Sequence, residues 1–438
     1  MSKEHRWLAA EIDRWIADAV ITPEQGATLR ARYPVPEDGP PWGLILFSAI
    51  GAVITGLGVI LLIAYNWKDI PKFGKLALIL GSIAAAHAGG IWLRRHEDWR
   101  AATGEAVHLL GSMLFGSGIW LVAQIYNIDE HYPNGFLFWG LGALAMAWAI
   151  RSIPQGILAA ITFMIWGAAD AGDFSTPNEW ATLFIAAGVG PLVWRRQSAI
   201  LLGVVLAALY VSILFNAGER GDSYTVFVCA FAFSALLVAL ARLSEQVRLS
   251  RRAADVAAFF GWTGALICAG MLSFRVVARE FVRDMSRSGD LELPALVYSW
   301  GLVSLALAAW VWIAAACAHR RARPMHIEEW LLPAALLFAQ SLIHSGSFVG
   351  PVLVTLVFNL VVLCTGALWA VRGCREVRMA PTVAGSLIIA ALVFARYFDL
   401  FDSLAIRGLT FVGLGAAMFA EAMYFRRART AQSEGGRP

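Results

Sequence analysis

The stretch GSGIWLVAQIYNIDEHYPNG, from Gly116 to Gly135, decides the fold. It begins as an apolar helix in which Gly116 and Gly118 are small enough to let another helix approach closely. Polar side chains follow where the apolar run ends, and a second apolar run begins near Gly135. The pattern predicts two antiparallel membrane helices joined by a polar turn on the outer side. Candidate site residues of this turn are Gln124, Tyr126, Asn127 and Asp129.

The composition extends this prediction to the whole chain. Of 438 residues, 59% are hydrophobic and only 15% are charged, whereas soluble domains contain about 45–50% apolar and about 25% charged residues. Water could not cover so much apolar surface, so membrane lipids must act as the solvent. We therefore expect an all-α fold, a polytopic α-helical integral membrane protein.

Apolar runs of spanning length place about 14 transmembrane helices in residues 42–425. The fourth to sixth runs are short, so merging or re-entry would change the count by one or two. The runs lie at 42–65, 73–93, 103–125, 134–150, 153–170, 180–194, 198–217, 223–242, 253–274, 294–318, 328–344, 348–372, 380–398 and 406–425.

The 35 Lys and Arg residues test this count. With the N-terminus inside, most of them fall in the inside segments, as the positive-inside rule requires. Both termini are therefore predicted to be cytosolic. The basic residues are spread over membrane-edge loops, so a nucleic-acid partner is not expected. One external loop is long, Arg275 to Leu293, and its alternating apolar and charged residues predict a helix on the outer surface.

A small cytosolic piece precedes the spans. Residues 1–33 predict an amphipathic helical hairpin, in which Thr22 caps the second helix and Gln25 bonds back to the cap. It packs on the membrane domain or on a copy of itself, or it binds a different protein. Residues 34–41 form a Pro-rich linker, and 426–438 are expected to be a disordered cytosolic tail.

Ionisable side chains inside the spans are functional candidates. They are His87, Glu105, His108 and Glu421. His87 and His108 lie at similar depth on neighbouring helices, and Glu105 is one turn from His108, which predicts one hydrogen-bonded cluster reachable from the cytosol. The cluster is either a proton- or cation-linked pocket or a structural tie.

Two further groups of polar residues lie near the predicted outer side. Arg396 and Asp399 are three residues apart on a helix and are expected to pair. Acidic residues in several external turns form either a solvated rim or a cation-attracting vestibule. Three hairpins also resemble one another, at 62–69, 122–129 and 394–402. The likeness is either an internal repeat, of the kind common in transporters, or the result of the similar composition of apolar helices.

Signals for chemistry are few. The five cysteines form no CxxC pair, and the single Glu-x-x-His motif lacks the further carboxylates of a di-iron site, so neither a metal nor another cofactor is expected. No Gly-rich phosphate loop, HExxH or GxSxG motif occurs, so no enzyme activity is predicted.

Three motifs resemble a bacterial membrane protein family, domain of unknown function 2157 (DUF2157). They are W…ITPEQ…L…Y in the N-terminal hairpin, YNWKDIP after the first span and GSGIWLVAQIYNID. The likeness is good over about residues 5–150, and RYFDLFDSLAIRGL resembles the end of longer members. The resemblance implies a multi-pass protein of the bacterial inner membrane and assigns no chemistry.

Two classes of function stay open on the sequence alone. One is a transporter or lipid-handling protein, favoured by the helix count, the repeats and the intramembrane polar residues; its small-molecule substrate is unknown. The other is a non-catalytic scaffold or sensor that docks a protein partner, or associates with itself, through residues 5–33.

Overall fold

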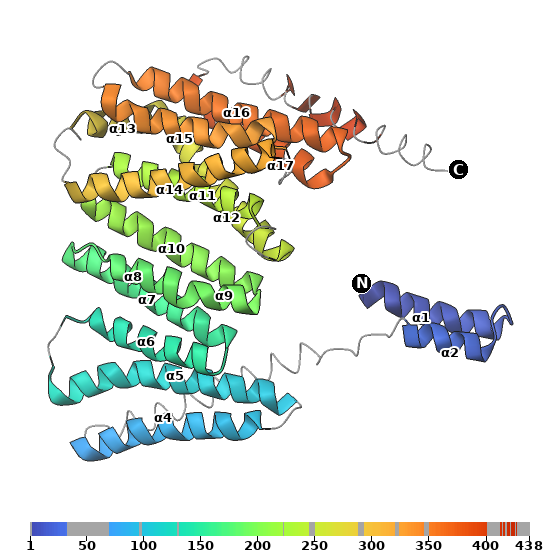
Figure 1. The fold of residues 1–438 in the computed structure, drawn as a ribbon, viewed down its shortest axis with the longest axis vertical. Helices are drawn as coiled ribbons and strands as arrows, with labels where there is room; N and C mark the ends of the chain where they lie inside the picture. The colour runs from blue at the N-terminus through green and yellow to red at the C-terminus, as the bar shows by residue number, and fades with distance from the viewer. Residues whose placement is uncertain are drawn as a thin grey trace. The chain divides into compact units, whose positions relative to one another are not determined.

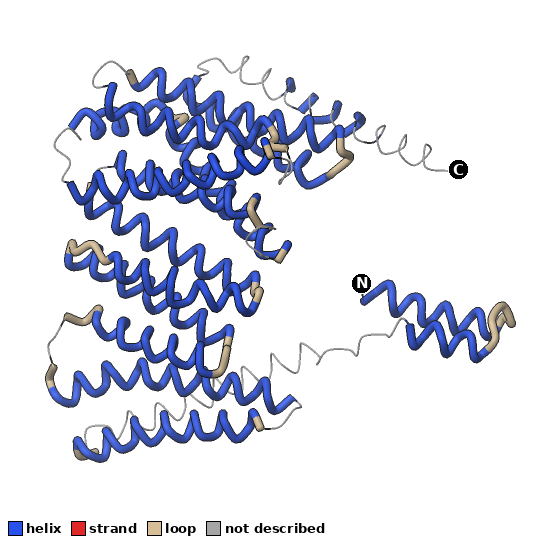
Figure 2. Tube along the Cα trace, viewed as in Figure 1, coloured by secondary structure: helices blue, strands red, loops and turns tan. Residues whose placement is uncertain are grey.

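The computed structural model describes most of the chain. The described residues are 2–32, 70–95, 99–128, 131–221, 223–244, 250–287, 293–319, 324–345 and 350–400, with short pieces between 412 and 426. Within them every regular element is a helix, and the helices are joined mostly by short loops (Figure 2). The chain divides into two units, residues 1–78 and 79–438.

The first unit contains the N-terminal hairpin of α1 (Ser2–Ala17) and α2 (Pro23–Arg32). The capping box expected from ITPEQ is present, because Gln25 N donates to Thr22 Oγ1 at 3.3 Å and Thr22 N donates to Gln25 Oε1 at 3.0 Å. Ile12 is buried between the two helices. The predicted linker 34–41 and the first apolar run, 42–65, lie outside the described residues.

The helices from α4 onward follow one another along the chain as a series of hairpins (Figure 1). Their bounds are α4 Lys72–Arg94, α5 Trp99–Tyr126, α6 Asn134–Ala149, α7 Ile153–Phe174, α8 Glu179–Leu183, η1 Phe184–Val189, α9 Gly190–Arg196, α10 Ala199–Arg220, α11 Ser223–Arg242, α12 Arg251–Leu272, α13 Arg275–Arg287, α14 Leu293–Ala318, α15 Ile327–Ser345, α16 Pro351–Arg375 and α17 Met379–Leu400.

Nine helices in the described part of the chain are long and apolar enough to cross a bilayer. They are α4, α5, α7, α10, α11, α12, α14, α16 and α17. Three more expected runs correspond to the shorter α6, to α15 and to the broken segment α8–η1–α9. The first expected run, 42–65, lies outside the described residues. Of the last expected run, 406–425, only short pieces are described. The multi-pass helical class is thus confirmed, and the count of about 14 stays a prediction.

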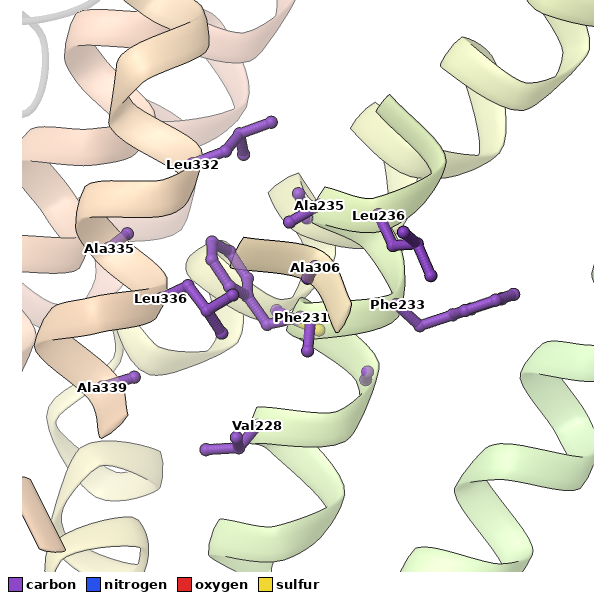
Figure 3. Packing of buried hydrophobic residues seen from close by; sticks show 14 of the residues in the cluster. Val228, Phe231, Phe233, Ala235, Leu236, Ala306, Leu332, Ala335, Leu336 and Ala339 are labelled. Atoms are coloured by element: carbon purple, nitrogen blue, oxygen red, sulfur yellow. The ribbon is translucent and has the colours of Figure 1, made fainter. Parts of the chain in front are cut away.

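The core of the second unit is built around α11. Small and aromatic side chains alternate there, and α11 is buried on nearly all sides against α12, α14 and α15. Figure 3 shows Val228 and Phe231 of α11 with Ala306 of α14 and Leu336 of α15. A helix enclosed by other helices needs no lipid-facing stripe, which explains why its sequence is apolar all round.

The segment after α8 departs from α-helical geometry. Residues Phe184–Val189 form a π-helix, and Pro191 follows in the first turn of α9. Proline has no backbone N–H and cannot continue the hydrogen bonds of the preceding turn, which accounts for the irregularity at this point. In the same segment the carbonyl of Gly188 accepts a tertiary hydrogen bond from Trp148 Nε1 at 3.0 Å.

The predicted surface helix at 275–293 corresponds to α13, Arg275–Arg287. It is amphipathic as expected, but it does not simply lie on a surface. Phe281 is almost fully buried, with its ring centroid 5.1 Å from that of Tyr224 on α11. The apolar face of α13 therefore contributes to the helical core.

Candidate functional site

His87 and His108 meet across the seam between α4 and α5. Their Nδ1 atoms are 3.2 Å apart, and His108 is fully buried. Each ring lies against a glycine of the opposite helix: a Cβ on Gly111 would approach His87 to 2.8 Å, and a Cβ on Gly90 would approach His108 to 2.8 Å. The reciprocal contacts explain why two glycines occur here, since any side chain would displace a ring.

Glu105 takes part in a different interaction. Its Oε1 accepts a hydrogen bond from Ser152 Oγ at 2.6 Å, and Ser152 caps α7 by accepting from Gln155 N. The carboxylate therefore links α5 to the beginning of α7, and no hydrogen bond joins it to either histidine in the described contacts. Whether His87, Glu105 and His108 act as one working site stays a prediction.

The remaining predicted site residues fall into two groups. The side chains of Glu421, Asp129 and Asp399 lie outside the described residues. Gln124, Tyr126 and Asn127 are exposed at the end of α5, and Asn127 has a positive φ of 51° that ends the helix. Arg396 donates to Ser273 Oγ at 2.5 Å, and its guanidinium lies over the Phe274 ring at 4.4 Å.

A cavity of about 630 Å³ lies between α4, α5 and α6. We call it the α4–α6 cavity. Its wall is largely apolar and includes Ile83, Phe115 and Val122, whereas its end near the start of α6 carries His131 and Tyr132. The cavity thus has an apolar body and a polar end, which is the lining that an amphipathic molecule requires.

The polar end of this cavity continues into a buried network that links four segments. His131 Nε2 lies 2.6 Å from Asp170 Oδ1, and Asn178 Nδ2 donates to Asp170 Oδ2 at 2.5 Å. Asn178 N donates to Asn216 Oδ1 at 2.5 Å, and Asn216 Nδ2 donates back to the Asn178 carbonyl at 3.1 Å. Asp170, Asn178 and Asn216 are all buried, so the network fixes the ends of α7, α8 and α10 against one another.

Tyr132 stands at the edge of the same network. Its hydroxyl donates to a carboxylate oxygen of Asp173, and this hydrogen bond raises the pKa of Tyr132. The Tyr132 side chain is exposed and also lines the α4–α6 cavity. It places a neutral hydroxyl and a neighbouring carboxylate at the polar end of that cavity.

A second, polar cavity of about 350 Å³ lies at the opposite end of α6. We call it the arginine pocket; it is lined by Trp148, Arg151, Leu192, Arg195 and Arg196. The guanidinium of Arg195 lies 5.0 Å from the centroid of the Trp148 ring. Among the described residues, none of the three arginines forms an ion pair with a carboxylate.

The sequence does not predict the polar network around Asp170 or the arginine pocket. Asn178 and Asn216 were not singled out, and the only available signal was a polar residue inside or beside an apolar run. Arg195 and Arg196 were used only to orient the chain. No group of three or more potential metal ligands occurs among the described residues.

The fold and these sites define the protein as a multi-pass α-helical membrane protein. Within this class, residues 13–156 match the model of a family described as "Predicted membrane protein (DUF2157)". The resemblance identified from the sequence motifs is confirmed over that range. Searches of curated proteins and of solved structures gave no match.

Proposed function

We propose that this protein handles lipid and binds one amphipathic lipid molecule in the α4–α6 cavity. The observation that carries the proposal is the graded lining of this cavity, from apolar side chains on α4 and α5 to His131 and Tyr132 at one end. An acyl chain would lie along the apolar wall, and the polar part of the lipid would reach the hydrogen-bonding groups.

Size and access support this function. The cavity volume of about 630 Å³ falls within the roughly 300–1,000 Å³ typical of small-molecule sites. Leu80 and Phe138 line the cavity and are each more than half exposed. Leu80 lies on the spanning helix α4 and Phe138 on the shorter apolar α6, so an opening at these side chains would let a ligand enter from the bilayer without crossing water.

Photolabelling tests the proposal. The purified protein is reconstituted in phosphatidylcholine vesicles with a phospholipid that carries a diazirine on one acyl chain, irradiated and digested for peptide mass spectrometry. We expect labelling to concentrate on residues 115–123 of α5. The variant Ala123→Trp should reduce it severalfold, because Ala123 lines the cavity and the indole would occupy the space.

Ala106→Trp is the matched control. Ala106 lies on the same helix, is exposed and does not line the cavity, so its replacement should leave the labelling unchanged. Labelling spread evenly over all lipid-facing helices, or equal loss in both variants, would contradict the proposal. That result would favour the alternative, a scaffold or sensor that acts through residues 5–33.

A further inference from the structure

We infer that the arginine pocket binds the phosphate of an anionic phospholipid headgroup. This site is separate from the α4–α6 cavity, because the two lie at opposite ends of α6. Asn134 and Trp148 are 14 positions apart on this helix, which corresponds to about 20 Å along the helix axis. The inference therefore goes beyond the proposed function and does not depend on it.

The charge of the pocket selects the class of ligand. Arg151, Arg195 and Arg196 bring three guanidinium groups to one cavity, and Arg94 adds a fourth nearby, where its Nη2 donates to the carbonyl of Ile150. The carboxylate of Glu105 on α5 is already engaged by Ser152, the cap residue of α7. A set of guanidiniums without carboxylate partners favours an anion, and their forked donors fit phosphate oxygens.

The pocket is held in shape by its own hydrogen bonds and turns. Trp148 is anchored by its bond to Gly188 of the π-helix, and the indole supports the Arg195 guanidinium. Arg151 has a φ of 52°, a left-handed conformation in the tight turn between α6 and α7, and Arg196 ends α9. The three arginines therefore come from two helix ends that are fixed by packing rather than from one free loop.

The location distinguishes a lipid from a soluble phosphate. Arg151 lies in the turn that follows the apolar α6, and Arg195 lies in the last turn of α9, so both are at the ends of apolar segments. The distribution of basic residues predicts this side to be cytosolic. Basic pockets between helices on that side are suited to anionic headgroups. Trp148 also supports a lipid ligand, because its amphipathic ring is suited to the headgroup layer.

Native mass spectrometry tests the inference. The protein in detergent is titrated with dioleoyl phosphatidylglycerol, and dioleoyl phosphatidylcholine serves as the lipid with a neutral headgroup. We expect specific phosphatidylglycerol adducts that fall about tenfold in Arg195→Gln/Arg196→Gln, since each lost charged hydrogen bond removes a substantial part of the affinity. The single variant Arg196→Gln, an exposed position, covers the case in which the double variant does not fold.

The matched control is Arg375→Gln/Arg378→Gln. It removes two exposed arginines from the end of α16 and the turn after it, on the same predicted side and outside the pocket. Retention of phosphatidylglycerol by this control supports the inference, and equal loss in both double variants would show a general surface-charge effect and overturn it. An excess of inorganic phosphate that displaces the lipid from wild-type protein would likewise overturn the assignment to a lipid headgroup and point to a soluble phosphate.

Discussion

The two ends of α7 both bury polar side chains, but the ends differ in whether those side chains have hydrogen-bond partners. At the Asp170 end both carboxylate oxygens are hydrogen-bonded, and Asn178 and Asn216 pair with each other through backbone and side chain. At the Ser152 end Gln155 is fully buried, yet neither its amide oxygen nor its amide nitrogen has a hydrogen-bond partner among the described residues. One end is a completed network, and the other contains an amide whose hydrogen-bonding capacity is unused.

The difference indicates what each end contributes. A fully paired network in a low-dielectric interior fixes one arrangement of the helices that supply it. An unpaired buried amide costs stability and contributes nothing to the packing arrangement. We therefore expect the Asp170 end to hold the helices together, and we expect the Ser152 end to tolerate, or even benefit from, replacement of the Gln155 amide.

The largest effect is expected for Asp170→Ala. The substitution leaves Asn178 and His131 without their shared partner, and removal of one member of a buried charged hydrogen-bond group costs about 3 kcal/mol in the free energy of unfolding. The measurement is SDS-induced unfolding in mixed micelles, followed by tryptophan fluorescence.

Asp170→Asn serves as the conservative control. It preserves the shape of the side chain and an acceptor oxygen, so its cost should be clearly smaller. An Asp170→Ala variant as stable as wild type would show that the network at this end does not hold α7, α8 and α10 together.

The opposite sign is expected for Gln155→Met. Methionine has nearly the same length and needs no hydrogen bond, so the variant should gain about 1 kcal/mol in the free energy of unfolding by removing an unsatisfied buried amide. The same unfolding assay gives the value. A clear loss of stability would instead indicate that Gln155 has a partner, such as a bound water or ligand, and would remove the contrast between the two ends.

Sequence reasoning succeeds where the geometry is local or the helices are consecutive. The approach of His87 to His108 follows from helical rise, because two residues at equal depth on consecutive spans can meet across their seam. The capping box at Thr22 and Gln25 follows from a local motif with fixed geometry. The two histidines lie on neighbouring helices, where the helical rise gives their depth. Thr22 and Gln25 lie three positions apart, where the motif fixes the distance between them.

The parts that could not be predicted depend on tertiary packing. Asn178 and Asn216 are 38 positions apart, and their contact is set by the rotation of α10 about its axis, which no local pattern specifies. The break in the segment 180–194 had a signal in Pro191, but the π-helix and its bond to Trp148 depend on the neighbouring α6. For the same reason Arg195 was predicted only as a charge at a membrane edge and not as part of a pocket.

The smallest effect is expected for Glu105→Gln, which also tests the histidine seam. A glutamine at this position can still accept a hydrogen bond from Ser152, so only the charged character of that bond is lost. The cost should be below about 1 kcal/mol in the free energy of unfolding, measured in the same assay.

The pH dependence of labelling separates the two interpretations of the histidine seam. If Glu105 serves only to link α5 to α7, then diazirine labelling of the α4–α6 cavity should be the same in the wild-type and variant proteins and independent of pH in both. If His87, Glu105 and His108 instead work together as a proton-linked site, the variant should alter the pH dependence of labelling while leaving stability nearly intact. The burial of His108 favours the first outcome, since it limits access of water to that imidazole.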